Sequence, residues 1–183
     1  MTESPVTSEF MAGFLSDTES RWAESLLNPH IYGFQFQAGT KWNPGLSEAE
    51  IASYQALIGV DFPDDLVVFL RHANGTDTDT KNIYGSEGAR PAHGTGVYSY
   101  PRDWEIIEDR IARLKEDWSE MLDELRASGV DLGISPKFIP FYSHRYVLSN
   151  GDPTSSIVCS IVGSDAIVYG WNLKEYLEKE FLD

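Results

Sequence analysis

Ser156-Ile-Val-Cys-Ser-Ile-Val162 is the stretch that decides the fold. From Ile157 to Val162 its apolar residues occupy both odd and even positions. A run of this kind is typical of a strand whose sheet is covered on both faces. We therefore predict a central strand here, with Ile161 in the hydrophobic core.

Shorter strand patterns on both sides of this run complete a sheet. Candidate strands cover residues 138–142, 146–149 and 166–169, with turn residues between them. A final helix is expected from Asn172, because Asn172-Leu-Lys-Glu175 has the form of a capping box. These elements predict a meander followed by a helix.

A longer pattern precedes the meander. Apolar residues recur at steps of three and four from residue 104 to residue 125, and Gly129 follows as a stop. The pattern predicts one long helix, either packed across the sheet or, with three heptads, in a coiled coil. We favour packing across the sheet.

The N-terminal half contains further helix signals. Ser16-Asp-Thr-Glu19 and Ser47-Glu-Ala-Glu50 both have capping-box form, so helices are expected from each. Residues 1–14 are predicted to be a flexible N-terminus, and residues 15–183 a single domain, which is an ordinary domain length. The fold class is α+β, with a single antiparallel or mixed sheet of about five to six strands and helices packed against it.

The order of these signals is similar to a known family. Three pieces carry the likeness in the first half: Gly45-Leu-Ser-Glu-Ala-Glu-Ile51, Gly59-Val-Asp-Phe-Pro-Asp-Asp-Leu66 and Asn74-Gly75. Later pieces are Phe138-Ile-Pro-Phe-Tyr142, His144-Arg-Tyr146 and Ser164-Asp-Ala-Ile-Val-Tyr-Gly170. Together they resemble the SUKH (Smi/Knr-type) superfamily, in its bacterial branch.

The resemblance implies an α+β fold and a frequent role as an immunity protein, which binds and neutralises a toxin. It also allows a regulatory scaffold protein without a toxin partner. One position departs from the family pattern, since Gln55 stands where the first signature helix usually has Glu.

Charge and composition narrow the choice of partners. The chain has 29 acidic and 14 basic residues, a formal net charge of −15. That charge repels phosphate backbones and anionic membrane surfaces, so neither nucleic acid nor a membrane is an expected partner. It favours a protein partner with a basic surface. Solubility alone is the other explanation of the charge.

The only cysteine, Cys159, excludes a disulfide within the chain and fits a reducing compartment. The N-terminus has no secretory pattern and no run reaches 18 apolar residues, so we expect a cytoplasmic protein. Cys159 itself is expected to be a small buried hydrophobe.

Catalytic and metal-binding motifs are missing from the sequence. No two of the four histidines have helical zinc-ligand spacing, and Asp77-Thr-Asp79 lacks the later ligands of a calcium loop. No metal, cofactor or enzymatic activity is expected. A small hydrolase is the less favoured alternative, with His93, His144 and Asp152 as its candidate residues.

Seven residues are candidates for contact with the partner. They combine carboxylates at a helix start and in the loop expected at residues 76–93 with aromatic side chains, which are common anchors of interfaces. The candidates are Asp64, Asp65, Asp77, Asp79, Tyr84, Tyr98 and Tyr100. The sequence therefore predicts a non-catalytic binding module, in which this set holds a basic toxin that attacks nucleic acid.

Overall fold

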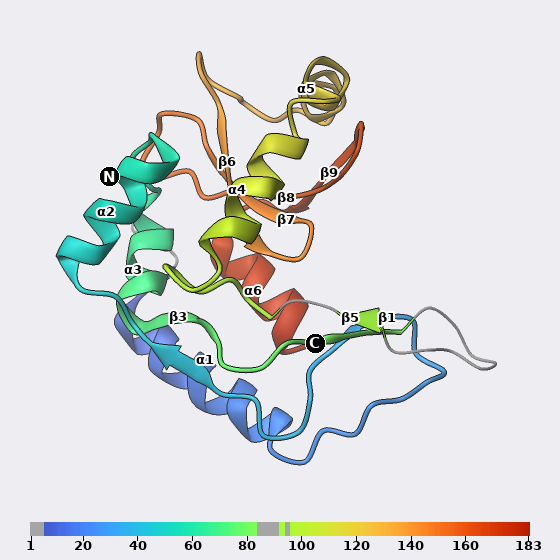
Figure 1. Ribbon diagram of the computed structural model, residues 1–183. Coiled ribbons are helices and arrows are strands. Elements are labelled where there is room, and N and C mark those ends of the chain that lie inside the picture. Colours follow the sequence, from blue (N-terminus) through green and yellow to red (C-terminus); the bar gives the residue numbers. More distant parts are fainter. Residues whose placement is uncertain (1–5, 84–91, 94–95) are drawn as a thin grey trace.

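The computed structural model describes residues 6–83, 92–93 and 96–183 (Figure 1). Residues 137–170 form four antiparallel strands, which lie in chain order across one sheet. The strands are β6 (Lys137–Tyr142), β7 (Arg145–Ser149), β8 (Val158–Val162) and β9 (Asp165–Gly170). This order confirms the meander and puts β8 in the interior of the sheet.

Each face of the sheet has its own hydrophobic core. Val158 of β8 is fully buried in the larger core, with Val147 of the adjacent β7 and Ile139 of β6. The next residue, Cys159, is fully buried in the smaller core on the other face, where Ile161 also lies. The apolar run therefore forms a doubly covered strand as predicted, although Val162 at its end is exposed.

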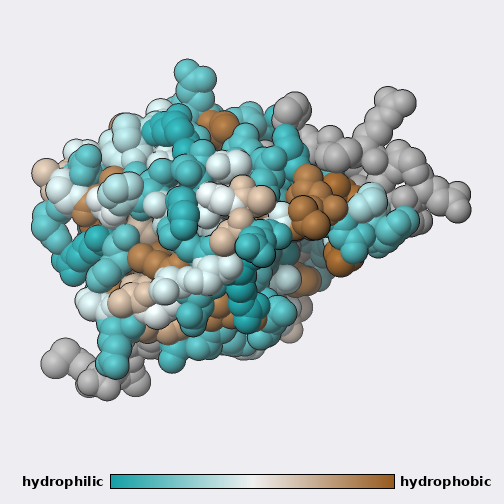
Figure 2. Space-filling view, turned by 90° about the horizontal axis from the view of Figure 1, so that it is seen from below, coloured by the Kyte–Doolittle hydropathy of each residue, from teal (hydrophilic) through white to brown (hydrophobic). Residues whose placement is uncertain are grey.

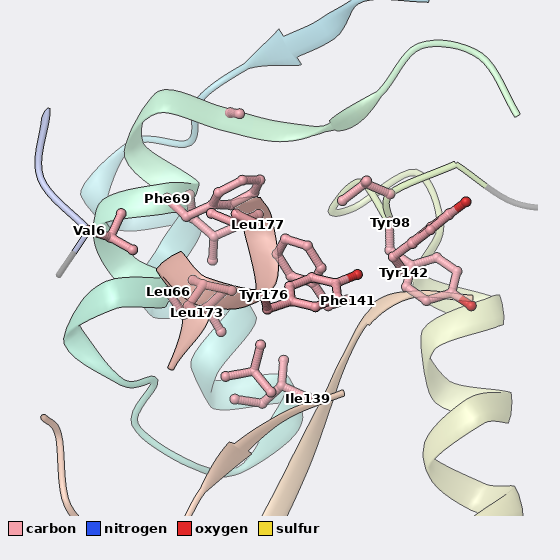
Figure 3. Packing of buried hydrophobic residues seen from close by; sticks show 14 of the residues in the cluster. Val6, Leu66, Phe69, Tyr98, Ile139, Phe141, Tyr142, Leu173, Tyr176 and Leu177 are labelled. Atoms are coloured by element: carbon pink, nitrogen blue, oxygen red, sulfur yellow. The ribbon is translucent and has the colours of Figure 1, made fainter. Parts of the chain in front are cut away.

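Helices cover both faces. The larger core takes side chains from α1 (Ser8–Trp22), α2 (Glu48–Ile58), α3 (Asp64–His72) and α6 (Leu173–Phe181). Figure 3 shows Leu66 and Phe69 of α3 beside Leu173 and Leu177 of α6. None of the helices in the described part of the chain has the length and hydropathy needed to cross a membrane.

The prediction of a single sheet of five to six strands is wrong. Within the described residues two smaller antiparallel sheets accompany the meander. One pairs β2 (Trp42–Pro44) with β3 (Ala73–Thr76), and the other contains β1 (Gly33–Gln35), β4 (Lys81–Ile83) and β5 (Ala92–His93). Alternation after Gly33 indicates a short strand at β1, but it does not reveal the partner strand, because β1 and β2 pair with strands about thirty or more residues away.

The first helix begins earlier than predicted. α1 starts at Ser8, with the Thr7 side chain accepting a hydrogen bond from the Phe10 N–H at 3.1 Å. Met11 and Phe14 of its first turns are buried. Of residues 1–14, predicted to be a flexible N-terminus, those from Val6 onward are therefore folded. The Ser16 capping box is also wrong, because both its ends lie inside the helix.

The long helix predicted at residues 104–125 is divided in two. α4 (Trp104–Arg113) buries Ile107 in the larger core, whereas α5 (Trp118–Ala127) buries Met121 and Leu125 in the smaller one. One straight helix cannot bury side chains in cores on opposite faces of a sheet. The chain therefore turns at residues 114–117. No Pro or Gly marks this turn in the sequence.

Two other capping signals are confirmed, one of them in part. Ser47 and Glu50 form the complete capping box of α2, and Gly59 ends that helix in the left-handed conformation. The Asn172 side chain caps α6, but Glu175 accepts from Trp171 N instead of closing the box. Gln55 accepts from the Phe62 N–H at 2.7 Å, a bond that the oxygen of a Glu could equally accept.

Asp65 joins three separate parts of the fold. It lies at the start of α3 and is only 2% exposed. Its carboxylate accepts hydrogen bonds from the Val6 N–H at 3.2 Å and from the Ser156 hydroxyl at 2.6 Å. The Ser156 oxygen in turn accepts from the Leu173 N–H at 3.0 Å. One carboxylate thus links α3 to the segment before α1 and to the start of α6.

Ile161→Asp should unfold the protein, and Ile167→Asp should not. Ile161 is 3% exposed in the smaller core, whereas Ile167 on the adjacent strand is 51% exposed. An unpaired buried carboxylate costs several kcal/mol, against a typical total stability of about 5–15 kcal/mol. Thermal unfolding followed by circular dichroism would compare the two variants. Equal melting temperatures would mean that Ile161 is not a core residue.

Replacing Asp65 should change how stability depends on pH. Burial raises the pKa of Asp65, and the hydrogen bonds from Ser156 and Val6 oppose that shift. Because the folded pKa lies above the unfolded value of about 3.9, the contribution of Asp65 is fully present below that pH. It is lost as the pH rises through the folded pKa. Relative to Asp65→Asn, which does not titrate, the wild-type chain should therefore lose stability across this window.

Urea unfolding of both proteins at a series of pH values measures this difference. Asp64→Asn is the matched control, because Asp64 is the exposed neighbour in the same first turn of α3. A wild-type advantage that grows with rising pH would contradict the prediction. It would show that the two hydrogen bonds outweigh burial in setting the Asp65 pKa.

Candidate binding surface

An acidic hollow of about 540 Å³ lies where the segment between β3 and β4 meets the start of α4. Its charged lining consists of Asp77, Asp79 and Asp103 with Lys81 and Arg102. Gln37, Thr78 and Ile106 complete it. The structure thus brings together two carboxylates predicted to contact a partner, Asp77 and Asp79, and both are exposed.

Both predicted carboxylates are held in place by the backbone. Asp77 accepts hydrogen bonds from the Lys41 N–H at 2.8 Å and from the Thr78 hydroxyl at 3.0 Å. Asp79 accepts a longer bond from the Gly96 N–H at 3.4 Å, and its own carbonyl accepts from the Gln37 amide at 2.6 Å. The two side chains therefore face solvent from ordered positions.

Arg102 already neutralises part of the hollow. Its guanidinium donates two bonds to the Asp103 carboxylate, at 2.9 and 2.8 Å, and a third to the Thr76 carbonyl at 2.8 Å. Its hydrogen bond to Asp103 raises the pKa of Arg102, and the charges of Asp79 and Asp77 contribute in the same direction. Asp103 is thus engaged within the protein, which leaves Asp77 and Asp79 as the carboxylates open to a ligand.

Other predicted contact residues lie elsewhere. Asp64 is exposed at the start of α3 and is not part of the hollow. The prediction that Asp65 contacts a partner is wrong. Its side chain is buried, and its carboxylate oxygens accept hydrogen bonds from the Val6 N–H and the Ser156 hydroxyl. Tyr84 lies outside the described residues.

The aromatic candidates are mainly structural. Tyr98 is 5% exposed and donates a hydrogen bond to the Ser143 carbonyl at 2.8 Å, so its prediction as a contact residue is wrong. Tyr100 is half-buried and stacks on Tyr54, with ring centroids 4.6 Å apart. Asn74 fixes the Tyr100 backbone through two hydrogen bonds. Tyr100 is therefore only partly accessible to a partner.

The part of the hollow that lies at the start of α4 was not predicted from the sequence. By its place before a predicted helix, Asp103 suggests only a charge that favours the helix start. Arg102 and Ile106, which is 39% exposed, carried no signal of their own. Arg102-Asp103 at the beginning of a helix pattern, opposite a loop with two acids, is a combination that could have pointed to this surface.

Of the residues of the alternative hydrolase, the two with described side chains, His144 and Asp152, line different hollows. His144 Nδ1 lies 3.0 Å from the Ser143 hydroxyl oxygen, but that serine is only 3% exposed. Burial lowers the pKa of His144 to about 4, and the charges of Arg145 and Arg110 add to this. Asp152 is exposed, and its carboxylate accepts from Thr154. The side chain of His93 lies outside what the structure describes.

Metal and thiol chemistry have no support in the described residues. No group of three or more His, Cys, Asp or Glu side chains placed to hold a metal ion occurs among them. Cys159 is fully buried, as predicted, and burial raises the pKa of its thiol to about 12. Since the thiolate is the reactive form, this cysteine is unreactive at neutral pH.

The face seen in Figure 2 is largely hydrophilic, with a prominent hydrophobic group on the side that carries the β1 sheet and smaller ones elsewhere. Large exposed apolar side chains in the segment before β1 are Leu26, Ile31 and Tyr32. These side chains precede β1 and do not line the acidic hollow. The hollow instead includes Gln37, which lies in the segment after β1.

Comparison with known proteins gives one result. Neither a curated protein nor a solved structure shows significant similarity to the chain. The model of the SMI1 / KNR4 family (SUKH-1) matches residues 45–180, from the turn before α2 into α6. The match covers most of the chain and includes α3, the hollow's loop and the whole meander. The chain therefore belongs to the SMI1 / KNR4 (SUKH-1) family.

Proposed function

We propose that this protein is a non-catalytic binding module, an immunity protein that neutralises a toxin with a basic surface. The observation that carries the proposal is the pair Asp77 and Asp79, exposed and fixed in a hollow on a chain of net charge −15. Family membership supports the same role. Toxins that attack nucleic acid need basic surfaces to hold phosphate, so a carboxylate-lined hollow is complementary to them.

The shape of the hollow suits a long cationic side chain. A lysine or arginine of the partner can place its charged group near Asp77 and Asp79. Its methylene stem can lie against Ile106, since such side chains bury the stem and keep the charge in a polar setting. Arg102 keeps Asp103 out of this contact and Lys81 also lines the hollow, so the site suits a single cation.

The fixed positions of Asp77 and Asp79 in the free protein favour binding. Asp77 and Asp79 are already held by Lys41, Thr78 and Gly96 before any partner arrives. Less side-chain freedom is then lost on association, and preorganisation of this kind increases affinity. Because both carboxylates are exposed, their main effect is expected on the association rate.

Asp77→Asn combined with Asp79→Asn should slow association with the basic toxin domain that this protein is proposed to neutralise. Asn keeps an acceptor oxygen for the Lys41 and Gly96 N–H groups, so stability should change little. At low salt the association rate should fall about tenfold. At 1 M salt, where the Debye length is about 3 Å, wild type and variant should be similar. Surface plasmon resonance with the purified toxin domain across a salt series measures this.

Glu120→Gln combined with Glu124→Gln is the matched control. It removes two exposed charges from α5, outside the hollow, and alters the net charge equally. A slower rate for the hollow variant alone supports the proposal. Equal slowing by both variants would mean that only overall charge matters, and unchanged binding by the hollow variant would remove this surface from the interface.

A further inference from the structure

A second pocket, of about 380 Å³, differs from the acidic hollow in its mainly apolar lining and in the absence of acidic lining residues. Its apolar lining comes from α2, from the end of α4 with the turn that follows, from the start of α5 and from β6. These residues are Ile58, Ile111, Leu114, Trp118 and Phe138. The remaining lining residues are Lys115 and Lys137, so the pocket has two cationic residues and no acidic one.

The walls of the pocket are firm. Leu114 and Phe138 are 8% and 3% exposed, and both belong to the smaller core. Trp118 packs edge-on against Phe138, with ring centroids 5.8 Å apart. The pocket is therefore a preformed hollow above the smaller core, within the size range of small-molecule sites.

The turn between α4 and α5 creates this pocket. The sequence pattern favours a continuous helix here, but residues 114–117 leave it, with the Lys115 and Glu116 N–H groups bonding three residues back. Departures from local preference often mark functional sites. The turn also separates charges, since Lys115 lines this pocket while Glu116 and Asp117 line another hollow, beside Arg110 and Arg113.

The two lysines set the chemistry of the ligand. Both are exposed, and neither takes part in any ion pair found among the described residues. A lysine can line an apolar wall with its stem while its ammonium group remains in solvent. A ligand complementary to this lining has an apolar body, which packs against the apolar side chains, and a single negative group, which pairs with the lysines.

We propose that this pocket binds a small amphiphilic anion, such as a medium-chain carboxylate. Its chain packs against Ile111, Trp118 and Phe138, and its carboxylate pairs with Lys115 and Lys137. A small monoanion fits better than an acidic protein surface, because repulsion by a chain of charge −15 grows with the charge of the approaching molecule. This site is independent of the proposed toxin surface.

Isothermal titration calorimetry with decanoate, kept below its micelle-forming concentration, tests the proposal. We expect one decanoate bound per chain, much weaker binding of butyrate, and no binding of decyltrimethylammonium, which has the same chain and the opposite charge. Lys115→Gln combined with Lys137→Gln should weaken decanoate binding about tenfold, equivalent to about 1.4 kcal/mol. Ile111→Trp, which fills the pocket, should abolish binding.

Arg21→Gln combined with Lys174→Gln is the control, since it removes two cations that do not line the pocket. Melting temperatures establish that each variant is folded. No heat with decanoate, equal binding of the cationic detergent, or equal loss of affinity in the control and the lysine variant would each overturn the proposal. Retained binding in a folded Ile111→Trp variant would place the ligand elsewhere and overturn it too.

Discussion

The constraint on which the structure depends is that β8 must be covered on both faces. Val158 and Cys159 are adjacent, and both are fully buried on opposite sides of the sheet. Neither face can be left exposed to solvent, because burying one large aliphatic side chain stabilises the folded state by about 1.5–3 kcal/mol. The helices of the N-terminal half and α6 cover one face. The short α5 covers the other, and the chain must bend after α4 to place it there.

Asp65 shows how the larger core is closed. A buried carboxylate is costly unless its oxygens receive hydrogen bonds, and here Val6 and Ser156 supply them. Those donors come from segments 59 and 91 residues away in sequence. The polar link thus fixes the segment before α1 and the entry to α6 relative to α3. Apolar packing, which has no direction, does not specify such an arrangement by itself.

Local chemistry made part of the fold predictable. The capping box at Ser47 and Glu50 needs only residues close in sequence. The apolar run of β8 indicates by itself that the strand is buried on both faces. The pairing of β2 with β3 and the turn after α4 depend on distant contacts, so no local pattern reveals them. Asp64 and Asp65 illustrate the same limit for the site. Both suit a helix start, yet only the fold decides that one faces solvent and the other Ser156.

α4 separates two surfaces of opposite character. Ile106 near its beginning borders the acidic hollow, with Arg102 and Asp103 just before it. Ile111 near its end borders the apolar pocket, and Lys115 follows. A helix of ten residues is about 15 Å long, whereas the Debye length at physiological salt is about 8 Å. The charges at one end are therefore largely screened from the other. A strongly acidic chain can in this way keep a local site that favours a small anion, because at short range the nearest charges outweigh the screened net charge of the protein.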